Sequence, residues 1–144
     1  MKVLAIDDAG FVHQIYRTAL KKVAGCTLLE ARDGLEGLRR LDEQGPVDLI
    51  ILDLNMPRMD GLQFLAELKR RPEWGTHVTV STTEDQEGKI REALQLGASS
   101  FIKKPFTLEQ LSELLRRVLP LLGEAGGGRP GAPALPAGAE PEAS

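Results

Sequence analysis

The chain has 144 residues, of which 42% are hydrophobic and 27% charged, with a formal net charge of −3. This length is typical of one domain with one core and is too short for two. Acidic and basic residues are mixed, and no run of lysines and arginines would neutralise successive phosphates, so no direct nucleic-acid partner is expected. The single cysteine, Cys26, excludes an internal disulfide and favours a reducing compartment.

The two ends of the sequence differ in character. Near the N-terminus the apolar run covers only Val3 to Ile6, which is too short for the core of a signal peptide or for a membrane span. We therefore expect a cytoplasmic protein without membrane insertion. From Leu122 onward glycine, alanine and proline dominate, and such a segment buries too little to offset the entropy of ordering. Residues 1–121 are predicted to form the domain and residues 122–144 a disordered tail: a tether, a localisation segment or a dispensable extension.

Short apolar runs alternate with stretches of helical periodicity, which is typical of an α/β fold with a parallel sheet. In chain order the predicted strands are Val3–Ile6, Cys26–Ala31, Val47–Leu52, Val78–Thr82 and Ser99–Ile102. The third is apolar without alternation, as expected for a central strand that is covered on both faces.

Each predicted strand is followed by a stretch with helical periodicity. The strongest apolar stripes comprise Phe11, Val12, Ile15, Tyr16, Ala19, Leu20 and Val23 near the start, and Leu108, Leu111, Leu115 and Val118 near the end. Weaker stripes are centred on Leu38, Leu65 and Ala93. Asp33 and Asp60 are interpreted as helix caps, and Pro120 is predicted to end the last helix. Four side chains are interpreted as surface residues: His13, His77, Lys89 and Lys103.

Polar residues stand where the predicted strands end: Asp7 and Asp8, Asp53, Thr82, and Lys104. The carboxyl ends of parallel strands meet at one edge of a sheet, so these side chains should converge. Clustered carboxylates repel one another unless a cation joins them, and Mg²⁺ is the hard divalent ion that such ligands favour. This arrangement suits phosphoryl transfer to a carboxylate. Asp53 is the predicted nucleophile, with Lys104 and the Thr82 hydroxyl as phosphoryl contacts.

These residues give the chain a family resemblance. It resembles the receiver domains of two-component response regulators, most closely the stand-alone chemotaxis-type (CheY-like) receivers, over about residues 2–120. The motifs, in order, are Asp7-Asp8, Asp53 with Met56-Pro57 and Asp60-Gly61, Thr82, Gly97-Ala98-Ser99, and Lys104-Pro105-Phe106. The resemblance implies a flavodoxin-like, doubly wound α/β fold: a five-stranded parallel sheet in the order 2-1-3-4-5 with five helices.

The resemblance also assigns the reacting groups. It implies that Asp53 is the phospho-acceptor, and that Asp7, Asp8 and Asp53 hold Mg²⁺ together with the backbone carbonyl of Asn55. Lys104 matches the phosphate-binding lysine, and its bond to Pro105 matches one that is cis in the family.

Two further positions match the family's switch. Thr82 corresponds to the hydroxyl that moves toward the phosphate, and Phe101 to the aromatic that rotates inward with it.

Three positions are implied to set the rate at which the acyl phosphate is hydrolysed. In the family, the positions of Asn55 and Glu84 flank the path of the attacking water, and an amide and an acid there resemble fast-resetting members. Thr83 stands where alanine is more frequent and narrows that path. The resemblance therefore implies a lifetime of seconds to minutes, governed by water access.

The predicted function is a response regulator that accepts a phosphoryl group from a histidine kinase or a histidine phosphotransfer protein. It catalyses only its own phosphorylation and autodephosphorylation, and by resemblance it acts on a downstream protein through the fourth helix, fifth strand and fifth helix. Two alternatives stay open. A phosphohydrolase needs a second carboxylate two residues after the nucleophile, where this chain has Asn55. An interaction module that is never phosphorylated usually lacks an acidic or lysine position, and none is lost here.

Overall fold

A computed structural model describes residues 1–71, 76–83 and 87–122. Residues 123–144 of the predicted tail and the predicted rate residue Glu84 lie outside the described residues, whereas Leu122, predicted to begin the tail, is helical and buried. The strands are β1 (Lys2–Ile6), β2 (Thr27–Ala31), β3 (Leu49–Asp53), β4 (His77–Thr83) and β5 (Ser100–Lys104). The helices are α1 (Gly10–Lys21), α2 (Gly34–Gln44), α3 (Gly61–Lys69), α4 (Glu87–Gln95) and α5 (Leu108–Leu122).

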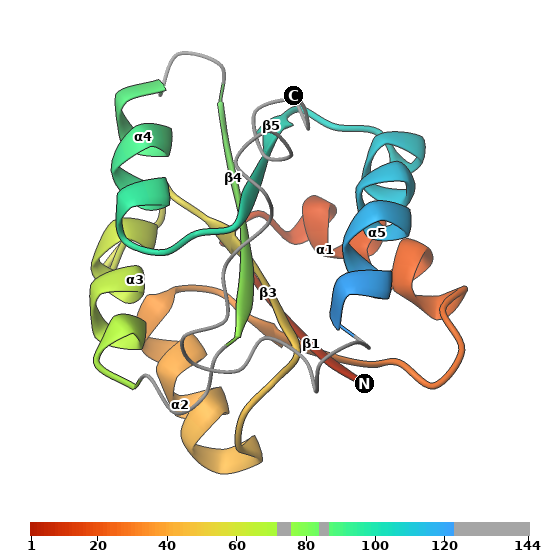
Figure 1. Cartoon of the computed structure of the whole chain (residues 1–144), viewed down its shortest axis with the longest axis horizontal. Coiled ribbons are helices and arrows are strands. Elements are labelled where there is room, and N and C mark those ends of the chain that lie inside the picture. The colour runs from red at the N-terminus through yellow and green to blue at the C-terminus, as the bar shows by residue number, and fades with distance from the viewer. Residues whose placement is uncertain (72–75, 84–86, 123–144) are drawn as a thin grey trace.

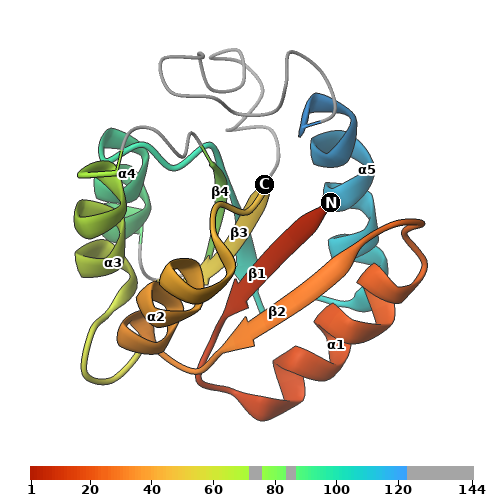
Figure 2. The same ribbon diagram turned by 90° about the horizontal axis from the view of Figure 1, so that it is seen from below.

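The strands form one parallel sheet in the order β2-β1-β3-β4-β5, as predicted. Helices α1 and α5 cover one face of the sheet, and α2, α3 and α4 cover the other (Figures 1 and 2). The observed strands overlap all five predicted ones, with boundaries that differ by one or two residues. The chain therefore has the doubly wound, flavodoxin-like architecture that the motifs implied.

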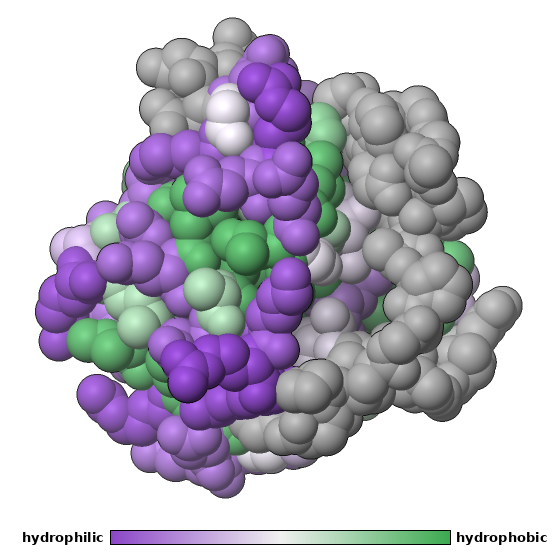
Figure 3. Space-filling model, turned by 60° about the vertical axis from the view of Figure 1, so that its left-hand side comes forward, coloured by the Kyte–Doolittle hydropathy of each residue, from purple (hydrophilic) through white to green (hydrophobic). Residues whose placement is uncertain are grey.

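The sheet separates two apolar clusters. Val3, Ala5, Leu49 and Ile51 belong to the cluster beneath α1 and α5, and the alternate residues of the same two strands belong to the cluster beneath the other helices. All five residues of β3 are buried, as expected for a central parallel strand. On the face formed by α2, α3 and α4, an apolar area remains visible between hydrophilic side chains (Figure 3). No helix in the described ranges is long and apolar enough to cross a membrane.

Two predictions about the helices are wrong. Phe11 is 72% exposed, because the buried stripe of α1 follows Val12 and Tyr16 and leaves Phe11 on the flank. Helix α5 continues past Pro120 to Leu122. A proline near the end of a helix removes only the hydrogen bond of its own nitrogen, and the buried Leu122 holds the last turn against the core.

Both histidines are buried, which corrects the prediction that they lie on the surface. His13 faces inward from α1, and its Nε2 lies 2.8 Å from the backbone carbonyl oxygen of Asp7. His77 begins β4 and is aligned with Leu49 of β3. Because burial disfavours the charged ring, the pKa of His77 is lowered from 6.5 to about 4.

His77 should make the fold sensitive to acid. The unfolded chain takes up this proton below about pH 6.5 and the folded chain only near pH 4, so stability that is complete above pH 6.5 falls between these values. Over this pH range we expect the free energy of unfolding of His77→Leu to fall by about 2–3 kcal/mol less than that of wild type. Urea unfolding of both proteins between pH 7 and pH 4.5 measures it. The same pH slope in both proteins would contradict the burial of an uncharged His77.

Candidate functional site

Three carboxylates converge at the carboxyl edge of the sheet. Asp7 follows β1, Asp53 ends β3, and these strands are neighbours, so the chain places both side chains together. Ligand oxygens of Asp7, Asp8 and Asp53 all lie within 4.8 Å of one another. Asp7 and Asp53 are buried and Asp8 is exposed. The arrangement puts two buried negative charges beside an acid that is open to solvent.

One ammonium group holds the two buried carboxylates. Lys104 ends β5, and its Nζ lies 2.8 Å from Asp7 Oδ2 and 3.4 Å from Asp53 Oδ2. Burial by itself would lower the pKa of Lys104, but the contacts with Asp7 and Asp53 outweigh it and raise the pKa. The Lys104–Pro105 bond is cis, as the resemblance implied. Lys104 is thus a permanent cation at the centre of the site.

The charge of Asp53 is not fully compensated. Its burial and the neighbouring charge of Asp7 raise its pKa from 3.8 to about 6, against the opposing pull of Lys104. Two negative side chains share one ammonium, so the ionised site stores repulsion. A further cation, or a group that removes the charge of Asp53, relieves it.

Asn55 and Thr82 lie next to the acceptor carboxylate. The Asn55 backbone N–H donates to Asp53 Oδ1 (3.1 Å), and its side-chain Nδ2 donates to Thr82 Oγ1 (3.3 Å). Thr82 is buried within β4 and Thr83 is exposed at the end of that strand. Phe101 of β5 is buried in the cluster that also contains Ile90. The metal-binding role of the Asn55 carbonyl stays a prediction.

The turn between β3 and α3 fixes the position of Asp53. Asp60 and Gln63 form a capping box at the start of α3, in which the side chain of each accepts from the backbone N–H of the other. This confirms the prediction that Asp60 is a helix cap. Gly61 then packs directly against the end of β3: a Cβ atom there would lie 2.6 Å from the Asp53 carbonyl oxygen. Only glycine allows this approach. Asp60 and Gly61 therefore hold the start of α3 against the backbone of Asp53.

Sequence reasoning missed an ion pair that links two loops at this edge. Asp33 caps α2 through the Glu36 N–H (2.9 Å) and also accepts from Nε of Arg58 (2.9 Å). Burial would raise the pKa of Asp33, but the bonds from Glu36 and Arg58 lower it overall. Arg58 has a φ of 65°, a backbone conformation uncommon outside glycine. A cap was predicted from the Asp33-Gly34 pair, but nothing in the sequence indicated its arginine partner.

Sequence reasoning also missed a pair of hydroxyls beneath the carboxylates. The hydroxyls of Tyr16 and Ser81 are buried, and neither forms a well-directed hydrogen bond within the described part of the chain. Burial and the charges of Asp7 and Asp53 raise the pKa of Tyr16 well above its ordinary value. Tyr16 was predicted only as part of an apolar stripe, a pattern that does not reveal where its hydroxyl points.

Sequence reasoning also missed a contact of Lys89 with the loop after β3. It was interpreted as a surface lysine, yet it is only partly exposed, and its Nζ donates to Asn55 Oδ1 at 2.8 Å. This contact joins the first turns of α4 to the loop after β3. Lys103, by contrast, pairs with Glu87 at 3.8 Å on the outer side of α4.

The carboxylates fit a hard divalent cation. All three candidate donors are oxygens, two of them buried beside a charge that Lys104 only partly compensates. Mg²⁺ takes one or two protein carboxylates and keeps several waters, and the exposure of Asp8 leaves room for water on that side. Asp7, Asp8 and Asp53 are the residues that would hold it.

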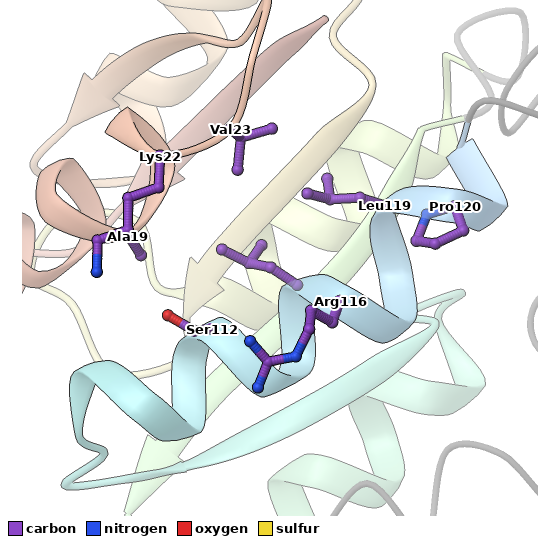
Figure 4. A pocket seen from close by; sticks show the side chains of 8 residues that line it. Ala19, Lys22, Val23, Ser112, Arg116, Leu119 and Pro120 are labelled. Atoms are coloured by element: carbon purple, nitrogen blue, oxygen red, sulfur yellow. The ribbon is translucent and has the colours of Figure 1, made fainter.

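A cavity of about 510 Å³ lies between α1 and α5, away from the carboxylates (Figure 4). Its lining comes from the C-terminal part of α1, including Ala19, from Val23 just after that helix, and from α5, including Leu119. Helix α1 begins at the carboxyl edge of the sheet and runs back, so this cavity lies toward the opposite edge. It does not belong to the candidate site.

The fold and the site together define the class of the protein. A family model described as the response regulator receiver domain matches residues 3–116. The chain therefore belongs to the receiver-domain family of two-component signalling.

Within that family the chain is CheY-like. It is 33% identical over 117 residues to a chemotaxis protein CheY of Listeria monocytogenes, which covers 81% of this chain and 97% of the relative. It is 32% identical over 120 residues to CheY1 of Helicobacter pylori, with coverage of 83% and 97%. The solved structure of CheY4 from Vibrio cholerae superposes with a TM-score of 0.72 at 35% identity, covering 81% of this chain and 97% of that one.

Removing the charge of Asp53 should stabilise the fold. Its pKa is raised to about 6, so in divalent-free buffer at pH 8 the ionised group destabilises the folded state. We expect Asp53→Asn to increase the free energy of unfolding by about 1–3 kcal/mol. Asp42→Asn is the charge-matched control, because Asp42 is exposed and pairs only at the surface with Arg71. Equal effects of both substitutions, measured by urea unfolding, would contradict repulsion at the site.

Tyr16→Phe tests the buried hydroxyls. A buried polar group without a good partner destabilises a fold, so removing the hydroxyl should raise the free energy of unfolding by about 1 kcal/mol. A double-mutant cycle with Ser81→Ala, followed by urea unfolding, measures whether the two hydroxyls interact. A loss of stability in Tyr16→Phe would instead mean that the phenol donates a strong bond to Ser81 or Asp7.

Proposed function

We propose that this chain is a phosphorylation-dependent signalling switch whose acceptor is Asp53. The observation that carries the proposal is the buried carboxylate itself: Asp53 ends the central strand, faces Asp7 and Asp8, and is held by Lys104 at 3.4 Å. Each group that phosphoryl transfer to a carboxylate requires is thus within one cluster of side chains. The family model that the chain matches spans residues 3–116 and so includes all of these residues.

The transfer would move a phosphoryl group from a phosphohistidine to Asp53. An oxygen of the Asp53 carboxylate attacks phosphorus, the phosphorus–nitrogen bond breaks, and the imidazole leaves with the electron pair. Lys104 contacts the oxygens that carry the developing charge, and the Thr82 hydroxyl donates to one of them. When bound, Mg²⁺ would neutralise charge on the carboxylates and the phosphoryl oxygens. No side chain acting as a base is needed, because the nucleophile is already ionised above about pH 6.

The phosphoryl group would act as a charge switch. It adds close to two negative charges beside Lys104, and the Thr82 hydroxyl turns toward it. Phe101 packs in the same cluster as Ile90 of α4, so movement at β4 is transmitted to this part of the fold. We place the output surface on α4, β5 and α5, where a downstream protein would read the change. The donor would be a histidine kinase or a histidine phosphotransfer protein in the cytoplasm.

The reverse reaction would be slow hydrolysis by the chain itself. Water attacks phosphorus, the bond to Asp53 breaks, and inorganic phosphate leaves while the carboxylate is regenerated. Asn55 lies at the acceptor, and the exposed Thr83 is at the end of β4. We propose a lifetime of seconds to minutes, set by water access past Asn55, Thr83 and Glu84.

A phosphohydrolase acting on other esters is less well supported. Its general acid would stand two residues after the nucleophile, but that residue is Asn55, whose amide is engaged by Thr82 and Lys89. An amide does not supply the proton that a leaving alcohol needs.

Intact mass spectrometry after incubation with acetyl phosphate tests the proposal. We expect wild type to gain one phosphoryl group in the presence of Mg²⁺ and none after chelation, because the clustered charges repel the donor. Asp53→Ala should gain none, and Asp42→Asn should behave as wild type.

A wild-type chain that gains no phosphoryl group while a known receiver gains one in the same tube would overturn the proposal. So would a gain that persists in Asp53→Ala, because the acceptor would then be another residue.

A further inference from the structure

The feature that carries a further inference is the contact of Lys89 with the acceptor loop. Lys89 lies on α4, and its ammonium donates to Asn55 Oδ1 at 2.8 Å. The same Asn55 is bonded through its backbone to Asp53 and through its side chain to Thr82. One residue, Asn55, thus contacts Asp53, Thr82 and Lys89 of α4.

The chemistry of the partners fixes the orientation of this amide. An ammonium only donates, so the atom of Asn55 that faces Lys89 must be the carbonyl oxygen. Nδ2 then faces Thr82, whose hydroxyl oxygen accepts. Lys89 therefore determines which way the side-chain amide of Asn55 is turned beside Asp53. Lys89 itself is not in contact with the Asp53 carboxylate.

We propose that Lys89 is a positioning residue that slows the hydrolysis of the aspartyl phosphate by holding the Asn55 amide away from water. This inference rests on the proposed function. The side-chain carbonyl oxygen of Asn55, Oδ1, is the atom that would accept a hydrogen bond from the attacking water. In this structure it accepts from the ammonium of Lys89 instead. The ammonium also contacts the residue two positions after Asp53, so its positive charge would favour the phosphorylated state.

The position of Lys89 also gives α4 a direct link to the reaction. Lys89 is carried by α4, and its ammonium contacts the loop that follows Asp53. A partner that displaces the start of α4 would withdraw Lys89 from Asn55. Binding at this helix would then change the lifetime of the phosphorylated state.

Lys89→Met tests the inference, because methionine keeps the length of the side chain and removes the ammonium. Arg91→Met is the matched control: it removes one positive charge from an exposed position two residues along the same helix. We expect the phosphoryl group of Lys89→Met to be lost about fivefold faster than that of wild type or Arg91→Met, as for the loss of one charge-assisted hydrogen bond. Lys89→Arg should restore most of the wild-type lifetime.

A second measurement needs no phosphoryl group. The side-chain amide of Asn55 gives its own pair of signals in a nitrogen-edited NMR spectrum, identified by their loss in Asn55→Ala. These signals should shift in Lys89→Met and stay in place in Arg91→Met, in the unphosphorylated protein.

The outcomes separate this inference from the proposed function. A phosphorylated Lys89→Met with the lifetime of Arg91→Met overturns the role of Lys89 alone. Unshifted Asn55 signals overturn the contact on which it rests. A wild-type chain that accepts no phosphoryl group overturns the proposed function and this inference with it.

Discussion

The repulsion between Asp7 and Asp53 is the constraint around which this structure is organised. Two carboxylates are buried at one edge of the sheet, and the single ammonium of Lys104 contacts both of them without cancelling their charge. A protein selected for stability alone would not retain such a pair. The unrelieved charge favours a cation at this edge, and under the proposed function it would let the site respond when a phosphoryl group arrives.

The parallel topology brings these groups together. β1, β3, β4 and β5 are successive neighbours; the last three end in polar residues and β1 is followed by Asp7, all at the same edge. The rest of the fold keeps that edge rigid: β3 is buried along its whole length, and Gly61 lets α3 begin against the backbone of Asp53. Rigidity matters because phosphoryl transfer depends mainly on positioning and electrostatics.

Polar contacts join the site to the helices around it. Beneath the carboxylates, Tyr16 and Ser81 place hydroxyls where an apolar core would be expected, and Arg58 binds the loop after β3 to the cap of α2. On the opposite side, Lys89 brings α4 to Asn55. These contacts connect the reacting carboxylate with α1, α2 and α4. Under the proposed function, the connections around Asp53 would set how the switch is tuned.

The sequence by itself determined the alternation of strands and helices and the convergence of Asp7, Asp53 and Lys104 at one edge, and the family resemblance supplied the order of the strands. Continuous apolar runs, helical periodicity and the motifs around Asp53 are local patterns, and the rule that parallel strands end at one edge converts them into a site. The tertiary structure decided what local patterns do not encode. His13 and His77 are buried, Phe11 is exposed, and Lys89 reaches the acceptor loop, because each depends on which side of an element faces a distant part of the chain. Burial and long-range polar contacts arise only when the elements pack.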